Sequence, residues 1–243
     1  MKQGKRIIWK GVCYFFILLF LLFLVCGVWY GVKGYQMYQN AITETSITEK
    51  TAALEQEEHF VSYEALPQIY IDAVISVEDH RFFSHSGIDS IAIARALWND
   101  LRTVSFAEGG STITQQLAKN QYFTQEKTLE RKFAEIFTAK AWEKTCEKEE
   151  IFALYVNTIY FGSGYYGIYE AAQGYFEVVP EELNDYEAIM LAGLPNAPTA
   201  YALDTHSDLA KQRMQQVLDC MISNQKLTQQ EANEILAEER LSN

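Results

Sequence analysis

The sequence predicts a mainly α-helical protein in which a single domain is anchored to a membrane by one N-terminal helix. The first indication is a run of twenty residues without a charge, from 11 to 30. The second is a series of later segments in which apolar side chains recur every three or four positions. No segment shows a convincing strand-like alternation, and we find no internal repeat. The 243 residues, 49% of them hydrophobic and 21% charged, suit one packed domain beside the anchor.

Residues 11–31 are long enough to form a transmembrane helix, since at about 1.5 Å per residue they span a hydrocarbon core of about 30 Å. A cleaved signal peptide is the alternative, but its apolar core has about 7–15 residues and ends at a small-residue cleavage site. Here Trp29 and Tyr30 end the run, as in the aromatic belt of a membrane surface. The basic tail, residues 1–10, is expected to stay in the cytoplasm. We therefore expect a single-pass protein of the cell membrane with an extracytoplasmic domain.

The remaining elements follow in order. Residues 32–60 are polar and weakly periodic, so we expect a juxtamembrane stalk or a loosely helical segment there. The domain is expected to occupy residues 61–243. Its first helix begins near Pro67, which a first helical turn tolerates, and Tyr70 and Val74 follow at helical spacing. Further helices are predicted over residues 88–101, 112–120, 128–142, 148–160, 166–176, 184–194, 207–223 and 228–236.

The net charge of −12 is unevenly distributed, because residues 1–33 carry five basic side chains and no acidic one. Removing these five positive charges leaves −17 on the rest of the chain. A domain this acidic is not expected to bind nucleic acid, whose phosphates require clustered cations. Any phosphate chemistry must depend on a few local basic side chains.

The four cysteines indicate neither a zinc site nor a disulfide framework. Cys13 and Cys26 lie in the apolar run, where they behave as small hydrophobic residues. For Cys146 and Cys220 the sequence leaves open whether they form a disulfide.

The first polar cluster is EDHRFFSHSG, in which the carboxylates of Glu78 and Asp79 precede Phe82 and His85. A solvated helix end would explain an acidic pair by itself. It does not explain the polar groups packed among phenylalanines, an environment in which a carboxylate can serve as a general acid or base.

The second cluster is GGSTITQQLAKN, residues 109–120, where a glycine pair leads to Ser111 as the expected N-cap of a short helix. Thr112, Gln116 and Lys119 then share one helix face at i, i+4 and i+7. A helix N-terminus behind glycines is a ready anion site, and Lys119 adds a full charge. An amphipathic surface helix would explain the glutamine and the lysine but not the glycines.

Three further segments are ambiguous when each is taken alone. In RKFAE, Arg131 and Glu135 form an i, i+4 pair of a kind that many surface helices carry, worth a few tenths of a kcal/mol. The segment YVNTIYFGSGYYG, residues 155–167, suggests core packing of Tyr155, Ile159 and Phe161 before a glycine-broken turn. The segment LAGLPNAPTAY, residues 191–201, is interpreted as a helix end and a proline-containing loop.

Together, in this order and spacing, the five segments resemble the glycosyltransferase domain of family 51, found in monofunctional peptidoglycan glycosyltransferases and class A penicillin-binding proteins. The resemblance covers about residues 66–201. It implies a lysozyme-like, mainly α fold with a small membrane-associated jaw subdomain. It also implies polymerisation of lipid II into β-1,4-linked glycan strands with release of undecaprenyl pyrophosphate.

By the same resemblance, Glu78 is the general base and Glu135 the second catalytic glutamate, near the leaving diphosphate. A divalent cation, Mg²⁺ or Mn²⁺, is an open option there, the metal ligands are unknown, and no organic cofactor is implied. The expected partners are lipid II, the growing glycan strand, the membrane and other proteins of cell-wall synthesis. The substrate-binding positions implied are Asp79, Phe82, His85, Ser111, Thr112, Gln116, Lys119, Asn120, Arg131 and Lys132. Such a reaction needs a base on one side and charge stabilisation on the other, and these residues supply both.

Two rival functions stay open. A lytic, lysozyme-like muramidase would also use a buried glutamate, but it has no evident use for diphosphate-binding cations. A catalytically inactive membrane scaffold of cell-wall synthesis would not need both Glu78 and Glu135. A transpeptidase domain is not expected, because Ser223 and Lys226 match the SxxK spacing only by chance and no KTG-type segment follows. We therefore expect a monofunctional enzyme.

Overall fold

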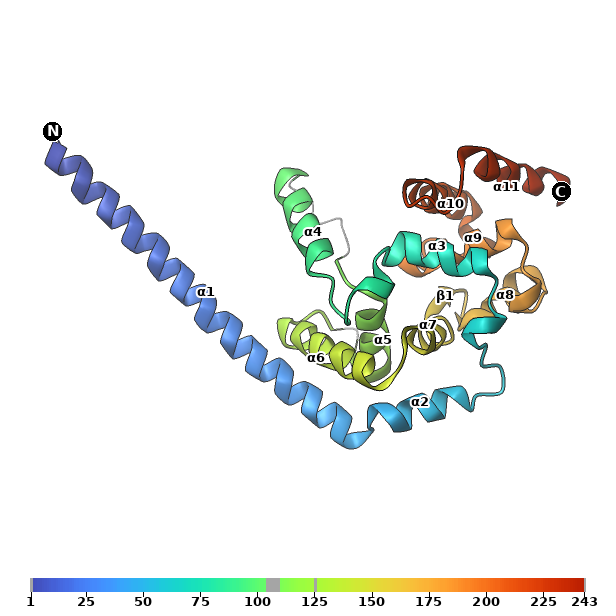
Figure 1. Ribbon diagram of the computed structural model, residues 1–243, viewed down its shortest axis with the longest axis horizontal. Helices are drawn as coiled ribbons and strands as arrows, with labels where there is room; N and C mark the ends of the chain where they lie inside the picture. Colours follow the sequence, from blue (N-terminus) through green and yellow to red (C-terminus); the bar gives the residue numbers. More distant parts are fainter. Residues whose placement is uncertain (1, 104–109, 125, 243) are drawn as a thin grey trace.

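The computed structural model describes residues 2–103, 110–124 and 126–242, and it confirms the mainly α fold class with a long apolar N-terminal helix (Figure 1). The elements are α1 Lys2–Glu44, α2 Ile47–Glu55, η1 Tyr63–Ala65, α3 Gln68–Glu78, η2 Phe82–Ser84, α4 Ser90–Thr103, α5 Ile113–Tyr122, α6 Leu129–Thr145, α7 Lys148–Val156, β1 Tyr160–Gly162, β2 Tyr165–Tyr166, α8 Ile168–Phe176, η3 Pro180–Glu182, α9 Asp185–Gly193, η4 Leu194–Asn196, α10 Leu203–Ser223 and α11 Gln229–Ser242.

Helix α1 continues without a break beyond the predicted membrane span. Its residues 9–44 form a helix long and apolar enough to cross a membrane, with a mean hydropathy of 2.8 in its most apolar window. Most of its large apolar side chains before residue 33 are exposed, and this part projects from the rest of the molecule in Figure 1. The domain thus leaves most apolar side chains of this part of α1 exposed, as expected of a helix that crosses a membrane.

The C-terminal part of α1 packs against α6. Gly34 is buried where the two helices approach, beside Phe133 and the backbone of Glu130. The ring of Tyr35 lies 5.3 Å from the ring of Phe137, centroid to centroid. The segment expected as a stalk thus begins as a helix that lies on the domain.

Helix α2 also packs on the domain. Its N-cap Ser46 and Glu49 form a reciprocal capping box, and Ile47, Thr51 and Leu54 are buried. A domain boundary at residue 61 stays a prediction, although the packing described here begins before it.

The core is built around α3 and α7. Tyr70 and Val74 of α3 are buried against α9 and α10, and residues 151–156 of α7 are all buried. Helix α5 packs between α6 and α7. The packing of these helices holds the C-terminal end of α3 next to the start of α5. The first two polar clusters of the sequence lie at this junction.

A short hairpin accompanies the helices of the mainly α domain, in a segment where the sequence shows no convincing strand. Strands β1 and β2 pair antiparallel, with Tyr160 opposite Tyr166 and Gly162 opposite Tyr165. The helix predicted to reach residue 160 ends at Val156, and the next begins at Ile168 instead of residue 166. Strands of three and two residues are too short to show an alternating pattern, so the sequence could not reveal them.

Candidate active site

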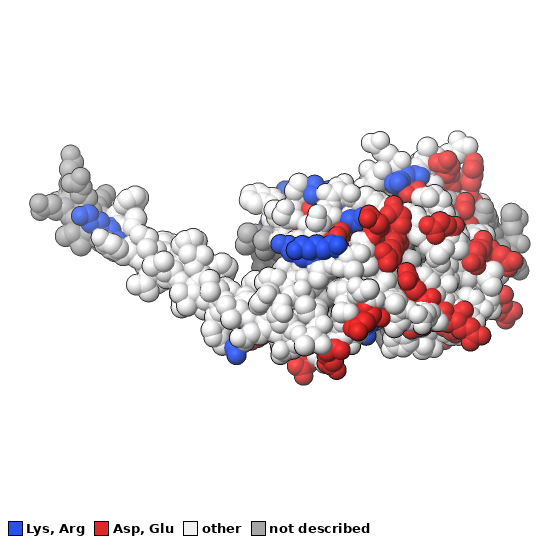
Figure 2. Space-filling view, turned by 60° about the horizontal axis from the view of Figure 1, so that its bottom comes forward, with Lys and Arg blue, Asp and Glu red and all other residues white. Residues whose placement is uncertain are grey.

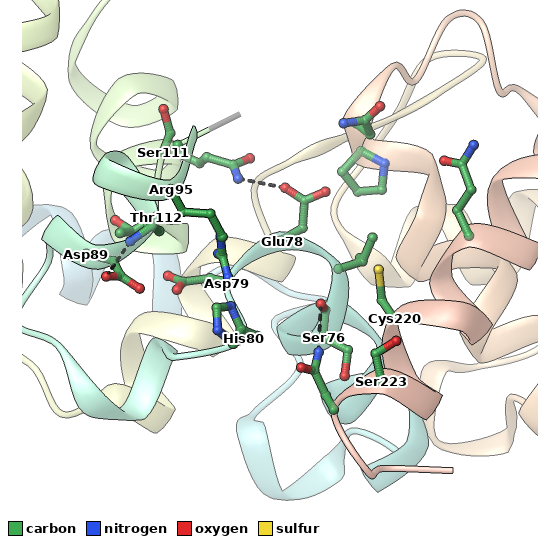
Figure 3. A pocket seen from close by; sticks show the side chains of 18 of the residues that line it. Ser76, Glu78, Asp79, His80, Asp89, Arg95, Ser111, Thr112, Cys220 and Ser223 are labelled. Atoms are coloured by element: carbon green, nitrogen blue, oxygen red, sulfur yellow. Dashed lines mark hydrogen bonds between the residues drawn. The ribbon is translucent and has the colours of Figure 1, made fainter. Parts of the chain in front are cut away.

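A cleft of about 820 Å³ opens where the C-terminal end of α3 meets the start of α5 and the inner face of α10 (Figure 3). Figure 3 shows Glu78 pointing into it, between Ser111 and Thr112 on one side and Cys220 and Ser223 on the other. The predicted site residues that line this cleft are Glu78, Asp79, Ser111, Thr112, Gln116 and Lys119. The shared face of Thr112, Gln116 and Lys119, predicted from their spacing, therefore faces the cleft.

Glu78 is the last residue of α3, and among the described residues only one of its carboxylate oxygens accepts a hydrogen bond. Gln116 Nε2 donates a hydrogen bond to Oε2 at 2.8 Å, and the hydroxyl of Tyr155 donates to Gln116 Oε1 at 3.3 Å. Burial, and then the charge of Glu78, raise the pKa of Tyr155 well above its ordinary value, so its hydroxyl stays a donor at neutral pH. Oε1 of Glu78 is buried and accepts no hydrogen bond from any residue that the structure describes.

Asp79 connects three segments and is not available as a second base. It accepts a hydrogen bond from the backbone N–H of Ile113 at 3.0 Å, at the start of α5. His85 Nε2 lies 2.9 Å from both of its oxygens. The side chain of His85 is 3% exposed and Phe82 is fully buried, so both shape the wall from behind.

Thr112, not the predicted Ser111, is the N-cap of α5. The Thr112 hydroxyl accepts from the N–H of Gln115 at 3.1 Å, and the Gln115 side chain accepts from the N–H of Thr112 at 3.0 Å. This reciprocal box needs Glu or Gln three residues after the cap, and the residue three after Ser111 is Thr114. Ser111 instead accepts a hydrogen bond from Lys132 Nζ at 2.6 Å.

Glu135 is buried on α6 between two cations. Lys132 Nζ lies 2.9 Å from Oε2, and Arg131 Nε lies 3.2 Å from Oε1, which confirms the predicted i, i+4 pair. Lys132 also reaches Ser111, so this cluster joins the edge of the cleft. It lies behind the cleft wall rather than in the lining itself.

Lys119 links the two glutamates electrostatically. Burial lowers the pKa of its ammonium, while the charges of Glu135 and Glu78 oppose this shift and those of Arg131 and Lys132 add to it. Lys119 thereby brings an amino group to the lining of the cleft, where it can bind an anion. Asn120, the next residue on α5, is half-buried and does not line the cleft.

Arg213 and Arg95 are cleft residues that the sequence analysis missed. Arg213 lies on α10, in the segment after residue 201 in which no motif was recognised, and its Nη2 is 3.7 Å from Glu78 Oε1. One signal was present: Arg213 lies between Ala210 and Val217 on the face that α10 buries. The loop interpreted as structural also contributes to the wall through Pro195 and Asn196.

The residues around Glu135 do not fit a resident divalent cation. Its oxygens face Lys132 and Arg131, and within the described part of the chain no three His, Cys, Asp or Glu side chains converge to hold a metal ion. We therefore derive no step through a metal.

The cysteines are all free, which answers the question of a disulfide that the sequence left open. Cys146 is buried with its sulfur 3.5 Å from the hydroxyl of Thr51, and Cys220 lines the cleft. Burial raises the pKa of the Cys146 thiol to about 11, so it is not a thiolate at neutral pH.

The chain matches the family described as "Transglycosylase" over residues 44–222. Among curated proteins it is similar to penicillin-binding protein 1A of Aquifex aeolicus (strain VF5), with 44% identity over 179 residues, or 74% of this chain and 25% of that protein. Penicillin-binding protein 1A of Neisseria lactamica is 41% identical over 185 residues, or 76% of this chain and 23% of that protein. The chain thus spans about a quarter of the length of these relatives.

Proposed function

The chain belongs to the transglycosylase family, whose domain is lysozyme-like and mainly helical, and on this premise we propose that it is a peptidoglycan glycosyltransferase. It would polymerise lipid II into β-1,4-linked glycan strands and release undecaprenyl pyrophosphate. The observation that carries the proposal is the cleft itself. Glu78 and Lys119 line it, Oε1 of Glu78 accepts no hydrogen bond from any described residue, and Lys132 contacts the lining residue Ser111 from behind the wall.

Glu78 is the proposed general base. The 4-hydroxyl of the acceptor sugar gives its proton to Glu78 as its oxygen attacks the anomeric carbon of the donor. Gln116 holds the other oxygen, so the carboxylate is fixed in place while Oε1 accepts no hydrogen bond from any described residue. Such positioning is effective because the reacting atoms must lie within about 3–3.5 Å of each other.

The cations stabilise the leaving diphosphate. As the bond from the anomeric carbon to the diphosphate breaks, negative charge collects on the phosphate oxygens, where Lys119, Arg131 and Lys132 offset it. Glu135 holds Arg131 and Lys132 in place through its two ion pairs. This local group explains how a chain with net charge −12 handles an anionic substrate.

The orientation in the membrane is a further part of the proposal, and the need for a divalent cation, for which the residues around Glu135 offer no site, is tested separately. The cation requirement is tested by assaying the enzyme with a chelator and then with Mg²⁺ or Mn²⁺ restored.

Orientation, with the tail of residues 1–10 in the cytoplasm, is tested by reporters fused to the C-terminal end. Activity only of a reporter that works in the cytoplasm would contradict the extracytoplasmic domain. Other proteins of cell-wall synthesis are proposed as partners on the resemblance alone.

The central experiment compares the wild type with Glu78→Gln, purified in detergent and incubated with labelled lipid II and Mg²⁺ or Mn²⁺. Polymer on a gel from the wild type alone would support both the reaction and the base. Release of muropeptides from purified sacculi would favour a muramidase. Binding of lipid II without release of undecaprenyl pyrophosphate would favour an inactive scaffold.

A further inference from the structure

Arg213 approaches the one oxygen of Glu78 that accepts no hydrogen bond. Its Nη2 lies 3.7 Å from Oε1, while the charged side chains are only 11% and 10% exposed. Hydrogen-bonded charge pairs have separations of about 2.7–2.9 Å, so this pair is close enough for charge attraction but leaves the lone pairs of Oε1 available.

Two other acceptors hold the guanidinium back from Glu78. Arg213 Nε donates to the carbonyl oxygen of Gly193 at 3.3 Å, and Nη1 donates to Gln216 Oε1 at 3.0 Å. The aliphatic stem packs closely on Gly193, where a Cβ atom would lie 3.1 Å from Arg213 Cγ. The position of the charge is therefore set by α9 and α10 and not by Glu78.

Burial disfavours an ionised carboxylate, so the surroundings of Glu78 must offset this effect for it to act as a base. Arginine is protonated at every pH at which the protein is folded, which makes Arg213 a permanent positive charge. Lys119 and Arg95 also line the cleft, but burial lowers the pKa of Lys119, which is also influenced by the charge of Glu135. Titratable and charged groups come close to Glu78 or line its cleft from several described elements: Arg213, Asp219 and Cys220 of α10, Lys119 of α5, Arg95 of α4, Tyr155 of α7, Tyr70 of α3, and Asp79, His80 and Asp89 after α3.

We propose that Arg213 is a positioning residue for the general base, keeping Glu78 ionised in the buried cleft while leaving Oε1 free to take the proton of the acceptor hydroxyl. The inference rests on the proposed function. In the step itself the hydroxyl proton moves to Oε1, the hydroxyl oxygen bonds to the anomeric carbon, and the diphosphate leaves with the electron pair of the broken bond. Arg213 keeps its proton throughout.

The test follows the protonation of Glu78 directly. The full chain, labelled with ¹³C at its glutamate carboxyl groups, is titrated by NMR in detergent, and Glu78→Gln identifies the signal. In Arg213→Gln the pH of half-protonation of Glu78 should rise by about 1–3 pH units. Arg213→Lys, which keeps the charge but not the fork, should retain most of the wild-type behaviour. In polymerisation assays, the acid limb of kcat should move with the titration while KM changes little.

The matched control is Lys226→Gln, which removes another cation that reaches α3, through a 2.7 Å ion pair with Asp72. It should leave the titration of Glu78 unchanged. Melting temperatures check folding, and Arg213→Met, which keeps the stem on Gly193, replaces Arg213→Gln if the latter unfolds. The proposal would be overturned if Glu78 were half-protonated at the same pH in the wild type and in Arg213→Gln or Arg213→Met. It would also be overturned if Arg213→Lys behaved like Arg213→Gln. A wild type that shows the expected titration but makes no polymer would count against the proposed function and not against this pairing.

Discussion

At the scale of single residues, neighbouring carboxylates serve different purposes because of their partners. One oxygen of Glu78 accepts no hydrogen bond from any described residue, whereas Asp79 receives hydrogen bonds from Ile113 and His85. Asp79 is 7% exposed, so its charge is stable only while these donors satisfy it. It thereby fixes the distance between the end of α3 and the start of α5.

Asp79→Asn is expected to lower the free energy of unfolding by about 1–3 kcal/mol. The new side chain has only one oxygen, and where its NH₂ group faces His85 it cannot accept the hydrogen bond that His85 donates to Asp79. Urea denaturation measures the loss, and the polymerisation rate should fall as well. Asp208→Asn, at an exposed position of α10, is the control and should change stability little. Equal stability of both variants would show that the contacts of Asp79 contribute nothing net.

Lys119→Met is expected to raise the melting temperature at neutral pH while reducing the polymerisation rate by on the order of a hundredfold. Burial lowers the pKa of Lys119, so the folded protein holds its charge at a cost. At pH values between the lowered pKa of the folded protein and the ordinary value of 10.5, Lys119 binds more protons in the unfolded chain than in the folded one. The contribution of Lys119 to the free energy of unfolding of the wild type therefore rises with pH in this range. The advantage of the variant should therefore shrink between pH 7 and pH 10. An advantage that is the same at both pH values would contradict this account.

The sequence predicted those site residues whose spacing is local. Gln116 and Lys119 share a helix face, and Arg131 and Glu135 form an i, i+4 pair, so helical periodicity was enough to place them. Arg213 could not be placed, because its approach to Glu78 depends on how α10 packs against α3. The catalytic and binding roles themselves remain predictions until the variants are assayed.

At the scale of elements, the contact between α1 and α6 connects the anchor to the helix that carries Glu135. The helices can approach because Gly34 has no side chain: a Cβ atom there would lie 2.4 Å from Phe133 Cβ and 2.8 Å from the carbonyl oxygen of Glu130. Glu130 precedes Arg131, so any displacement of this turn reaches the cationic cluster.

Gly34→Ala should destabilise the packing of α1 on α6 by about 1–3 kcal/mol and reduce polymerisation. Gly31→Ala is the matched control, since a Cβ atom at Gly31 meets nothing within 4 Å and both changes favour the helix equally. Thermal unfolding and polymer yield of the two variants give the comparison. A Gly34→Ala protein as stable and active as the control would show that the close approach is not needed.

The hairpin illustrates why elements were harder to predict than the fold class. Gly162, Gly164 and Gly167 all have positive φ, and Ser163 between them has φ 52°. These angles determine where the chain turns, but the sequence shows only that glycines are present. A helix end is predictable to within a few residues, whereas strands of three and two residues give no periodic signal.

At the scale of the whole molecule, charge is separated along the long axis. Figure 2 shows acidic side chains crowded over the part of the domain away from α1, while most of the projecting helix is uncharged. The exposed glutamates of the domain include Glu57, Glu149, Glu170, Glu181 and Glu182. An anionic membrane surface would repel that part of the domain, so charge and the apolar helix favour the same orientation.

The burial along α1 predicts that two N-terminal deletions behave differently. Deleting residues 2–31 removes apolar side chains most of which are exposed, so this protein should dissolve without detergent and melt within a few degrees of the wild type. Deleting residues 2–45 also removes Gly34, Tyr35 and the rest of the surface that packs on α6, and should lower the melting temperature clearly. With lipid II in vesicles, the shorter deletion should lose most of its polymerisation, because the domain is no longer held at the substrate's membrane. Equal melting temperatures for the two deletions would mean that α1 is only a tether, and undiminished activity on vesicles would mean that the domain binds the membrane without it.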